Sequence, residues 1–556
     1  MRYNHAELFA GVAAATPERD CIVFRDRRLR YRDVASRVNR LANLLLSHGI
    51  TVHRSRAELQ PWESGQDHVA LYLLNGNEYL EGMLGAAAAR AASLNVNYRY
   101  VEAELAYLLN DSSPRAIIYH ARFAPTLEAV LGSLRNPPAL LLQVADESGN
   151  ALLPGARDYE QALAASGDQA PRTAPDPDDL YMVYTGGTTG MPKGAIWAQA
   201  DILESALAAF LPEGLFDVSS TAEGVGLAVA GDRRVVLPLP PLMHAAAQWI
   251  ALAGVLTGGT VVFPDVVDRL DPAAVWEVID REGVQLMNLV GNSFATPLCD
   301  EFERGGFHGR SLQMIGTGGA VASASVKDRI LRLLPHVVIA DVAGSSETGS
   351  QLSNLSSVAE PAVSGVFTPA PGSCVVNEDR DRILEPGDPA TGWLGRYGAI
   401  PFGYLGDRDK TERTFPVVEG RRVAVPGDRA RHHADGSIEL LGRDSVTINS
   451  GGEKIFAEEV EEALIVHPAV GDVVVVGRPS ERWGSETVAV VQMVPGHDPT
   501  DEELLADAGR RLARYKLPKA IVRVDAVLRS PAGKADYRWA GTVAAEALSA
   551  QKELIK

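Results

Sequence analysis

The stretch that most limits which regular secondary structure this chain can form is residues 184–194, Tyr-Thr-Gly-Gly-Thr-Thr-Gly-Met-Pro-Lys-Gly. Three glycines and three threonines lie within six residues, so the stretch predicts neither a stable helix nor a central strand. It predicts a loop whose backbone N–H groups, threonine hydroxyls and Lys193 can surround an anion. Apolar residues at 180–184 and 194–197 flank the loop and indicate buried elements on both sides. We therefore expect a phosphate-binding loop.

This loop differs from the Walker A phosphate loop, in which Gly-Lys is followed by Ser or Thr. Gly190 precedes Met191, and Lys193 is followed by Gly194. A flexible surface turn is the alternative interpretation for a segment so rich in glycine and threonine. The flanking apolar runs favour a binding loop, because a loop held between buried elements is well placed to contact a ligand.

Size and charge narrow the class of protein. With 556 residues the chain is too long for one hydrophobic core, so several domains are expected. The net charge of −18 argues against nucleic acid as a partner, because phosphate backbones are bound mainly by clustered Lys and Arg. The three cysteines show no paired spacing, no apolar run is long enough for a membrane span, and the N-terminus lacks a signal core. We expect a cytoplasmic protein.

Strand-like and helical patterns alternate along the first part of the chain. Residues 21–24 and 69–74 are apolar strand-like runs, residues 31–46 carry apolar side chains at helical spacing, and residues 79–91 form an alanine-rich helix. This alternation predicts an α/β fold of layered sheets and helices. Residues 51–67 are interpreted as a surface insertion and residues 94–100 as a structural junction, both without chemistry.

Three candidate functional positions follow apolar strands. Residues 312–320 predict a strand that runs into a glycine turn, which is a natural ligand-binding edge of an α/β sheet. Residues 337–349 repeat this design and add Glu347. A carboxylate beside phosphates implies an intervening Mg²⁺, and the alternative is a glutamate at a helix N-terminus. His244 follows a buried strand and a proline-rich turn, where a lone histidine is usually structural.

The loop resembles the signature loop of the adenylate-forming enzymes, the superfamily of acyl-CoA synthetases, adenylation domains and luciferases. The family consensus is Thr-Ser-Gly-Ser/Thr-Thr-Gly-x-Pro-Lys-Gly, and Gly186 here replaces the serine, which removes one hydroxyl donor. The resemblance continues in order through Pro238-Leu239-Pro240-Pro241-Leu242-Met243-His244, Gly318-Gly319-Ala320, Ser345-Ser346-Glu347, Gly403-Tyr404-Leu405-Gly406-Asp407, Asp428, Gly442-Arg443-Asp444, Gly451-Gly452-Glu453-Lys454 and Lys534.

The resemblance implies a role for each of these elements. The phosphates of ATP would contact Thr185, Gly186, Gly187, Thr188, Thr189, Gly190 and Lys193. The rest of the nucleotide would contact Gly318, Gly319, Ala320, Asp341, Ala343, Ser345, Ser346, Asp428 and Arg443, with the last two at the ribose. The CoA channel would be lined by Gly451, Gly452 and Lys454. The catalytic residues would be Thr185, His244 beside the acyl carboxylate, Glu347 on Mg²⁺, and Lys534 at the α-phosphate. Ala343 departs from the family, which has an aromatic residue there to stack on adenine.

The same resemblance implies the domain organisation. A large N-terminal AMP-binding domain, residues 1–443, would combine layered α/β subdomains with a small β-rich subdomain. A smaller, mobile α+β domain, residues 444–556, would rotate about Asp444 between two half-reactions, because Lys534 and Lys454 lie at its opposite ends. Residues 284–298 predict core, with the wall of an acyl tunnel as the alternative.

The implied activity is that of an ATP-dependent acyl-CoA synthetase. A hydrophobic carboxylic acid, either a fatty acid or a steroid side chain, would be activated as acyl-AMP and transferred to CoA. The motifs are most similar to those of bacterial fatty-acyl and steroid side-chain synthetases. An acyl-AMP ligase or an adenylation enzyme that loads a carrier protein is one alternative, and a non-catalytic nucleotide-binding protein is another. Acyl chain length, formation of a homodimer and peripheral contact with a membrane stay open.

Overall fold

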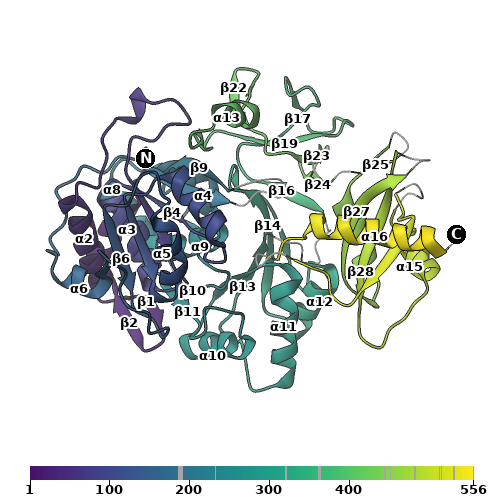
Figure 1. Ribbon diagram of the computed structural model, residues 1–556, viewed down its shortest axis with the longest axis horizontal. Coiled ribbons are helices and arrows are strands. Elements are labelled where there is room, and N and C mark those ends of the chain that lie inside the picture. Colours follow the sequence, from purple (N-terminus) through teal and green to yellow (C-terminus); the bar gives the residue numbers. More distant parts are fainter. Residues whose placement is uncertain are drawn as a thin grey trace.

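The computed structural model describes residues 1–556 with gaps at 186–191, 232, 320–321, 361–364, 444–445, 447, 451–452, 481–483, 513, 515, 530–532 and 555–556. For residues 443, 449, 453–454, 484 and 548–554 it describes the backbone alone. The strands up to residue 443 build two sheets in a large N-terminal body, and the later strands build a third sheet in a smaller C-terminal body (Figure 1).

Two sheets organise the N-terminal body. In the part of the chain that the structure describes, the smaller of them has eight strands in the order β20 (Gly403–Tyr404), β9 (Lys193–Ala198), β8 (Leu180–Thr185), β4 (Ala92–Asn95), β3 (His68–Tyr72), β5 (Ala116–His120), β6 (Leu140–Val144) and β7 (Arg157–Asp158). The larger sheet begins with β2 (Arg27–Arg30), β1 (Asp20–Phe24), β11 (Thr260–Phe263), β10 (Val235–Pro238), β12 (Leu286–Leu289), β13 (Met314–Gly318) and β14 (Val338–Ser345).

The larger sheet then continues into a β-rich subdomain. Its further strands are β15 (Gly349–Ser356), β16 (Val366–Pro369), β24 (Ile438–Arg443), β23 (Asp428–His432), β19 (Gly392–Tyr397), β17 (Ser373–Val376) and β18 (Ile383–Leu384), with β22 (Arg421–Ala424) and β21 (Val417–Val418) alongside. Strands β10 to β14 are parallel, whereas β15 and β16 are antiparallel to their neighbours. The change of direction at β14 and β15 gives a sharp turn at Glu347, so the alternative of a helix N-terminus at this residue is wrong.

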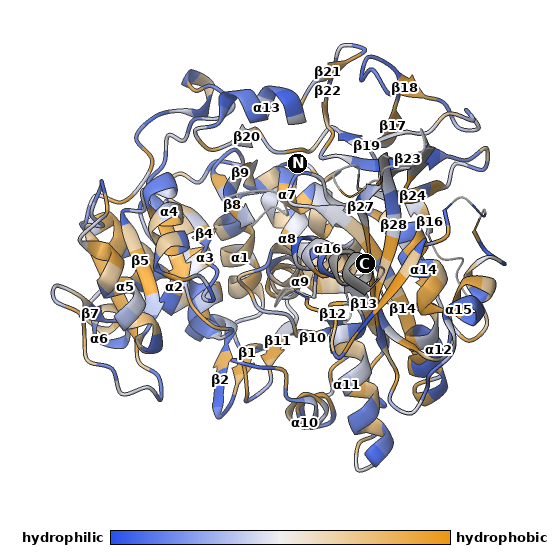
Figure 2. Cartoon of the chain, turned by 45° about the vertical axis from the view of Figure 1, so that its right-hand side comes forward, coloured by the Kyte–Doolittle hydropathy of each residue, from blue (hydrophilic) through white to orange (hydrophobic). Residues whose placement is uncertain are grey.

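Helices cover both faces of the two sheets. The helices between them include α1 (His5–Ala15), α2 (Tyr31–Ser47), α3 (Asn77–Ala88) and α9 (Ala245–Leu256). Val69 and Leu71 of β3 join this central core, whereas Ala70 and Tyr72 pack with α4 (Glu102–Ser112) and α5 (Ala124–Leu131) on the outer face. The period of two along a strand therefore produces alternating layers of helix and sheet. Figure 2 shows hydrophobic residues along the strands of both sheets.

The outer face of the larger sheet is covered by α10 (Pro272–Glu282), α11 (Gly291–Arg304) and α12 (Ala324–Leu333). Two short helical segments complete this body near the ligand-binding edge: the π-helical turn η3 (Leu203–Leu207) and α13 (Arg408–Thr414). Figure 2 shows that α13 is hydrophilic. The insertion at residues 51–67 packs here, because the Trp62 carbonyl accepts a hydrogen bond from the Gly406 amide, and the guanidinium of Arg408 lies over the Trp62 ring.

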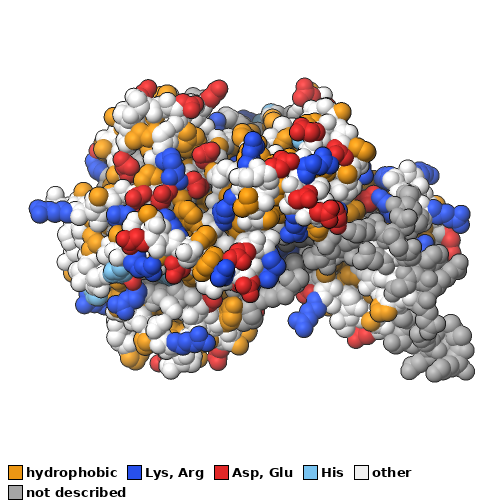
Figure 3. Space-filling model, turned by 90° about the horizontal axis from the view of Figure 1, so that it is seen from above, with side chains coloured by type: hydrophobic (Ala, Val, Ile, Leu, Met, Phe, Trp, Pro, Cys, Tyr) orange, Lys and Arg blue, Asp and Glu red, His pale blue; other side chains and the backbone are white. Residues whose placement is uncertain are grey.

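The C-terminal body has its own sheet, whose described strands are β26 (Glu453–Ile455), β25 (Ile448–Ser450), β28 (Gly484–Met493), β27 (Val470–Ser480) and β29 (Ala520–Val524). Helices α14 (Ala457–Ile465) and α15 (Asp501–Ala508) pack on one face, and α16 (Tyr537–Leu554) packs on the other. None of the helices described is both long and apolar enough to cross a membrane. Acidic and basic side chains are interspersed on the face seen in Figure 3.

Candidate active site

A cavity of about 540 Å³ opens where the C-terminal ends of several parallel strands meet the β-rich subdomain. Its polar lining includes Thr185, His244, Asn288, Thr317, Ser345, Ser346, Glu347, Ser350, Arg380, Tyr404, Lys410, Thr414 and Lys534. Its apolar wall includes Ala206, Phe210, Ala245, Ala246, Trp249, Ile250, Leu289 and Val290. A cavity of this size with polar groups at one side suits a small-molecule substrate.

Asn95 joins two parts of this site that are distant in sequence. Its side-chain Nδ2 donates to the carbonyls of Tyr184 and Met243, each at 2.7 Å, and its Oδ1 accepts from the Tyr184 amide at 2.8 Å. Tyr184 precedes the phosphate loop, and Met243 precedes His244. Asn95 is 4% exposed and lies in the segment that the sequence marked as a junction without chemistry. An asparagine at the end of a fully buried strand was the available signal for this positioning role.

We expect Asn95→Ala to destabilise the fold by about 3 kcal/mol, because it leaves three buried backbone groups without partners. Thermal or urea unfolding would measure the change. The matched control is Asn136→Ala, since Asn136 is exposed and its amide donates only to Ser113 Oγ among the contacts described. This control should change stability by less than about 0.5 kcal/mol. Equal effects of the two variants on stability would show that the Asn95 hydrogen bonds do not stabilise the fold more than an exposed contact does.

The structure describes the two ends of the predicted phosphate loop. Thr185 ends β8 and lines the cavity, and it pairs in register with Lys193 at the start of β9. The predicted contacts at Gly186, Gly187, Thr188, Thr189 and Gly190 lie outside the described residues. Lys193 Nζ forms an ion pair with Asp407 Oδ2 at 2.7 Å. Burial tends to raise the pKa of Asp407, but hydrogen bonds from Lys193 and the Lys410 amide outweigh it and lower that pKa.

Glu347 lies in the turn between β14 and β15 and faces the cavity. Its backbone N–H donates to Ser345 Oγ at 3.1 Å, and its Oε1 accepts a 2.6 Å hydrogen bond from the Tyr404 hydroxyl. The described residues contain no group of three or more His, Cys, Asp or Glu side chains that could hold a metal. One oriented carboxylate fits Mg²⁺, which is commonly bound through one or two carboxylates, water and substrate phosphates.

The nucleotide residues predicted on the glycine-rich edge divide into two groups. Gly318, Gly319, Ser345 and Ser346 line the cavity, whereas Ala320 lies outside the described residues. Asp341 faces away from the cavity, because its carboxylate accepts from Lys327 Nζ of α12 at 2.6 Å. Ala343 packs with the small core of the β-rich subdomain. The structure therefore does not bring the side chains of Asp341 and Ala343 into the cavity.

The two predicted ribose residues are neighbours. Asp428 and Arg443 lie opposite each other in the β23–β24 pair. Asp428 directly follows Pro426 and Gly427, which line the cavity. The side chain of Arg443 lies outside the described part of the structure. The register places both predicted residues beside one edge of the cavity.

His244 precedes α9 and lines the cavity between its polar and apolar walls. Its Nε2 is buried and has no hydrogen-bond partner among the described residues. Burial, and then the positive charges of Lys534 and Arg99, lower the pKa of His244 to about 4. The imidazole is therefore neutral at neutral pH and has a ring nitrogen available to a ligand.

The apolar wall answers the question about residues 284–298. Asn288, Leu289 and Val290 line the cavity, while Val284, Met287 and Leu298 belong to the core beneath it. The core interpretation is confirmed for the residues beneath the cavity, and an acyl tunnel along the residues at the C-terminal end of β12 stays a prediction. From α9, the residues at positions 245, 246, 249 and 250 complete the wall at helical spacing.

Lys534 reaches the cavity from the C-terminal body. The preceding Gly533 has φ of +74°, and an added Cβ would lie 2.9 Å from Ser293 Oγ at the start of α11. Glycine is required there because the loop turns in the left-handed region while it packs against this helix. Lys454 lies on β26, and Gly451 and Gly452 fall outside the described residues. Strand β25, the partner of β26, lies at the upper edge of the C-terminal body in Figure 1.

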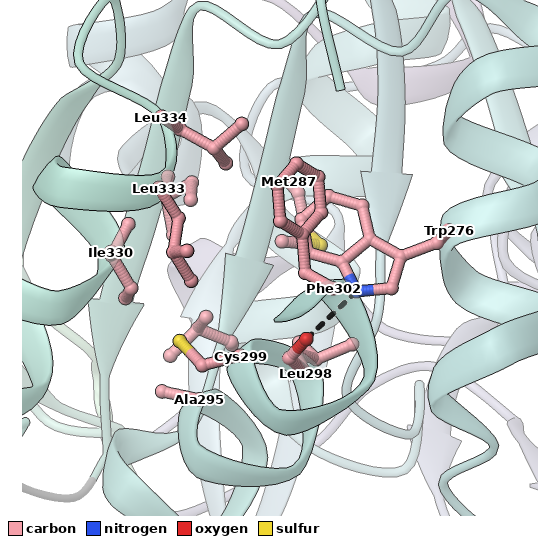
Figure 4. A pocket seen from close by; sticks show the side chains of 11 residues that line it. Trp276, Met287, Ala295, Leu298, Cys299, Phe302, Ile330, Leu333 and Leu334 are labelled. Carbon is pink, nitrogen blue, oxygen red and sulfur yellow. Dashed lines mark hydrogen bonds between the residues drawn. The ribbon is translucent and has the colours of Figure 1, made fainter. Parts of the chain in front are cut away.

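A second cavity, of about 20 Å³, lies under α10, α11 and α12 (Figure 4). Its wall is entirely apolar in character, with Met287, Leu298, Cys299 and Phe302 around it. The Trp276 indole N–H donates to the Leu298 carbonyl at 2.9 Å beside it. This void can accommodate at most about one water and is a packing defect, not a substrate site.

A family model described as AMP-binding enzyme matches residues 9–395, which is more than half of the chain. The chain belongs to the AMP-binding enzyme family. A second model, AMP-binding enzyme C-terminal domain, matches residues 459–534. The resemblance to adenylate-forming enzymes is therefore confirmed.

Relatives of known name support the same assignment to the AMP-binding enzyme family. The chain is 52% identical over 534 residues to the medium-chain acyl-CoA ligase Mig of Mycobacterium avium, covering 95% of this chain and 96% of that protein. It is 37% identical over 556 residues to the 3-oxocholest-4-en-26-oate–CoA ligase of Rhodococcus rhodochrous, covering 97% and 96%.

A solved structure of anthranilate CoA ligase AuaEII with anthranoyl-AMP matches with a TM-score of 0.81 at 19% identity, over 98% of both chains. The expected α/β fold with a large and a small domain is confirmed for this AMP-binding enzyme.

Proposed function

We propose that this protein is an ATP-dependent acyl-CoA synthetase that activates a hydrophobic carboxylic acid. The observation that carries the proposal is the convergence of Thr185, His244, Glu347 and Lys534 on one cavity, although they come from four separate segments. The named relatives are acyl-CoA ligases at up to 52% identity over nearly the whole chain, which supports the same reaction here.

In the first half-reaction, a carboxylate oxygen of the acid would attack the α-phosphorus of ATP. The bond from that phosphorus to the bridging oxygen breaks, and pyrophosphate leaves with the bonding electrons. Thr185 and the phosphate loop would hold the β- and γ-phosphates, and Lys534 would stabilise the charge that develops at the α-phosphate. Mg²⁺ bound at Glu347 would offset phosphate charge. Neutral His244 would donate a hydrogen bond to the acid without trapping its carboxylate as an ion pair.

In the second half-reaction, the CoA thiol would attack the acyl carbonyl and AMP would leave. We propose that the C-terminal domain, residues 444–556, rotates between the two steps, which would withdraw Lys534 and bring the Lys454 hairpin to the site. Asp428 and Arg443 would keep hold of the ribose throughout. The strand order supports this division, because no described strand of the C-terminal sheet pairs with the N-terminal sheets.

The apolar wall indicates the substrate class. Phe210, Trp249 and Ile250 would surround an aliphatic or steroid chain while its carboxylate lies beside His244. The relatives that act on medium-chain acids and on 3-oxocholest-4-en-26-oate support these two classes. The three cysteines are unpaired and buried, which suits a reducing compartment, and we propose a cytoplasmic location.

A screen for AMP release would test the function. We expect AMP formation that requires ATP, CoA and an aliphatic or steroid carboxylic acid, with shorter and aromatic acids giving at least about tenfold lower kcat/KM. Exchange of label between ATP and pyrophosphate should require the carboxylic acid but not CoA. Transfer to a phosphopantetheine carrier protein in place of CoA would favour the carrier-loading alternative. A total lack of exchange with every acid would favour a non-catalytic nucleotide-binding protein.

A further inference from the structure

Lys410 places a positive charge in the cavity that no predicted role uses. It lies on α13, its side chain is half-buried, and it lines the cavity together with Glu347 and Thr185. Its ammonium lies 4.3 Å from the centroid of the Tyr404 ring. The hydroxyl of that ring holds the Glu347 carboxylate, so a single aromatic side chain positions a cation and the candidate metal ligand beside each other.

Among the residues described, the Lys410 ammonium lies near carboxylates but forms no ion pair with them. Lys193 already pairs with Asp407 at 2.7 Å, which cancels its charge in the absence of a ligand. Among the described residues, no carboxylate lies within ion-pair distance of the Lys410 ammonium, and no hydrogen bond from it is formed. Burial, and then the neighbouring charge of Lys193, lower the pKa of Lys410, and the negative charges of Glu347 and Asp407 offset only part of this lowering. A bound phosphate would supply the missing compensation.

We propose that Lys410 binds the β- and γ-phosphates of ATP and the pyrophosphate released from them. This inference rests on the proposed function and adds a residue to it. Glu347 and Asp407 bring two negative charges close to Lys410, and Lys193 pairs with one of them. Lys410 adds positive charge that would attract a polyanion, and Lys534, the predicted partner of the α-phosphate, lines the same cavity.

Calorimetric binding of ATP, pyrophosphate and AMP to the full chain would test the proposal. Measurements in EDTA remove any contribution of a metal at Glu347. Lys410→Gln should raise the Kd for ATP and for pyrophosphate about tenfold, the lower end for a charge-assisted hydrogen bond because the side chain is half-exposed. The Kd for AMP should stay within about twofold, because AMP lacks the two terminal phosphates. Lys410→Arg should restore most of the affinity for ATP.

Arg408→Gln is the matched control, since Arg408 lies on the same helix with its side chain 66% exposed and paired with Glu412. It removes one positive charge without affecting the cavity and should leave all three affinities unchanged. Unchanged ATP and pyrophosphate binding in Lys410→Gln would overturn the proposal, as would equal weakening of ATP and AMP. Absence of ATP–pyrophosphate exchange in the wild type would instead count against the proposed function. The binding data would still decide whether Lys410 binds the β- and γ-phosphates.

Discussion

Replacing Lys534 with alanine should lower the rate of ATP–pyrophosphate exchange about 10²- to 10³-fold, the usual cost of removing one preorganised donor from a transition state. The same variant should still convert preformed acyl-AMP and CoA into thioester at close to the wild-type rate. The reason is positional: Lys534 lines the cavity from the C-terminal body, and a rotation of that body would remove it before CoA reacts. Both half-reactions are measured separately, the first by isotope exchange and the second by thioester formation.

The control for this prediction is Lys519→Ala, which removes an exposed lysine from the same C-terminal body. It should leave both half-reactions within about twofold of the wild type, as expected for a surface substitution. A Lys534→Ala enzyme that loses both half-reactions equally, with an unchanged unfolding temperature, would contradict the separation of the two steps.

The second large effect is expected for Glu347→Gln, which should reduce ATP–pyrophosphate exchange about 100-fold at a fixed Mg²⁺ concentration. Glutamine keeps an oxygen that can accept from the Tyr404 hydroxyl, so the turn between β14 and β15 should hold its shape. What it removes is the negative charge that a divalent cation requires. The exchange rate measured across a series of Mg²⁺ concentrations should show a raised half-saturation value.

Glu360→Gln provides the comparison, because Glu360 is exposed and belongs to the loop after β15. Its Mg²⁺ dependence should match that of the wild type. If Glu347→Gln lowered the rate at every Mg²⁺ concentration without shifting the half-saturation value, a purely structural role for Glu347 would explain the result better than metal binding.

Local patterns predicted the elements of the fold well. The helical repeat at residues 31–46 corresponds to α2, and the Asp435-Gly436 turn, a strong hairpin signal, joins β23 to β24. Both signals depend on neighbours in the sequence, namely helical spacing and turn chemistry. The hairpin of β14 and β15 was not foreseen, because the strand after Glu347 has no signal that distinguishes it from a helix start.

Contacts between distant segments explain what sequence reasoning missed in the site. Gly403 and Tyr404 pair with Ile196 and Ala195 of β9, which brings residues 403–410 close to Lys193. That pairing creates the Tyr404–Glu347 and Lys193–Asp407 contacts, and no motif spacing predicts it. Asn95 escaped notice for the same reason, since its partners lie 89 and 148 residues away.

The nucleotide residues Asp341 and Ala343 illustrate a different kind of difficulty. They alternate with Val342, which lines the cavity, so the period of two along β14 directs the two predicted side chains to the opposite face. The motif supplied the correct strand and turn. The alternation breaks at the irregularity between Ala343 and Gly344, which is why Ser345 also lines the cavity.

The pairing of β16 with both β15 and β24 ties the Glu347 turn and the Asp428 edge into one continuous sheet. Separating these two supports would break main-chain hydrogen bonds, so we expect the N-terminal body to stay rigid around a bound nucleotide. If the C-terminal body rotates as proposed, that one motion would limit both the entry of ATP and the release of products.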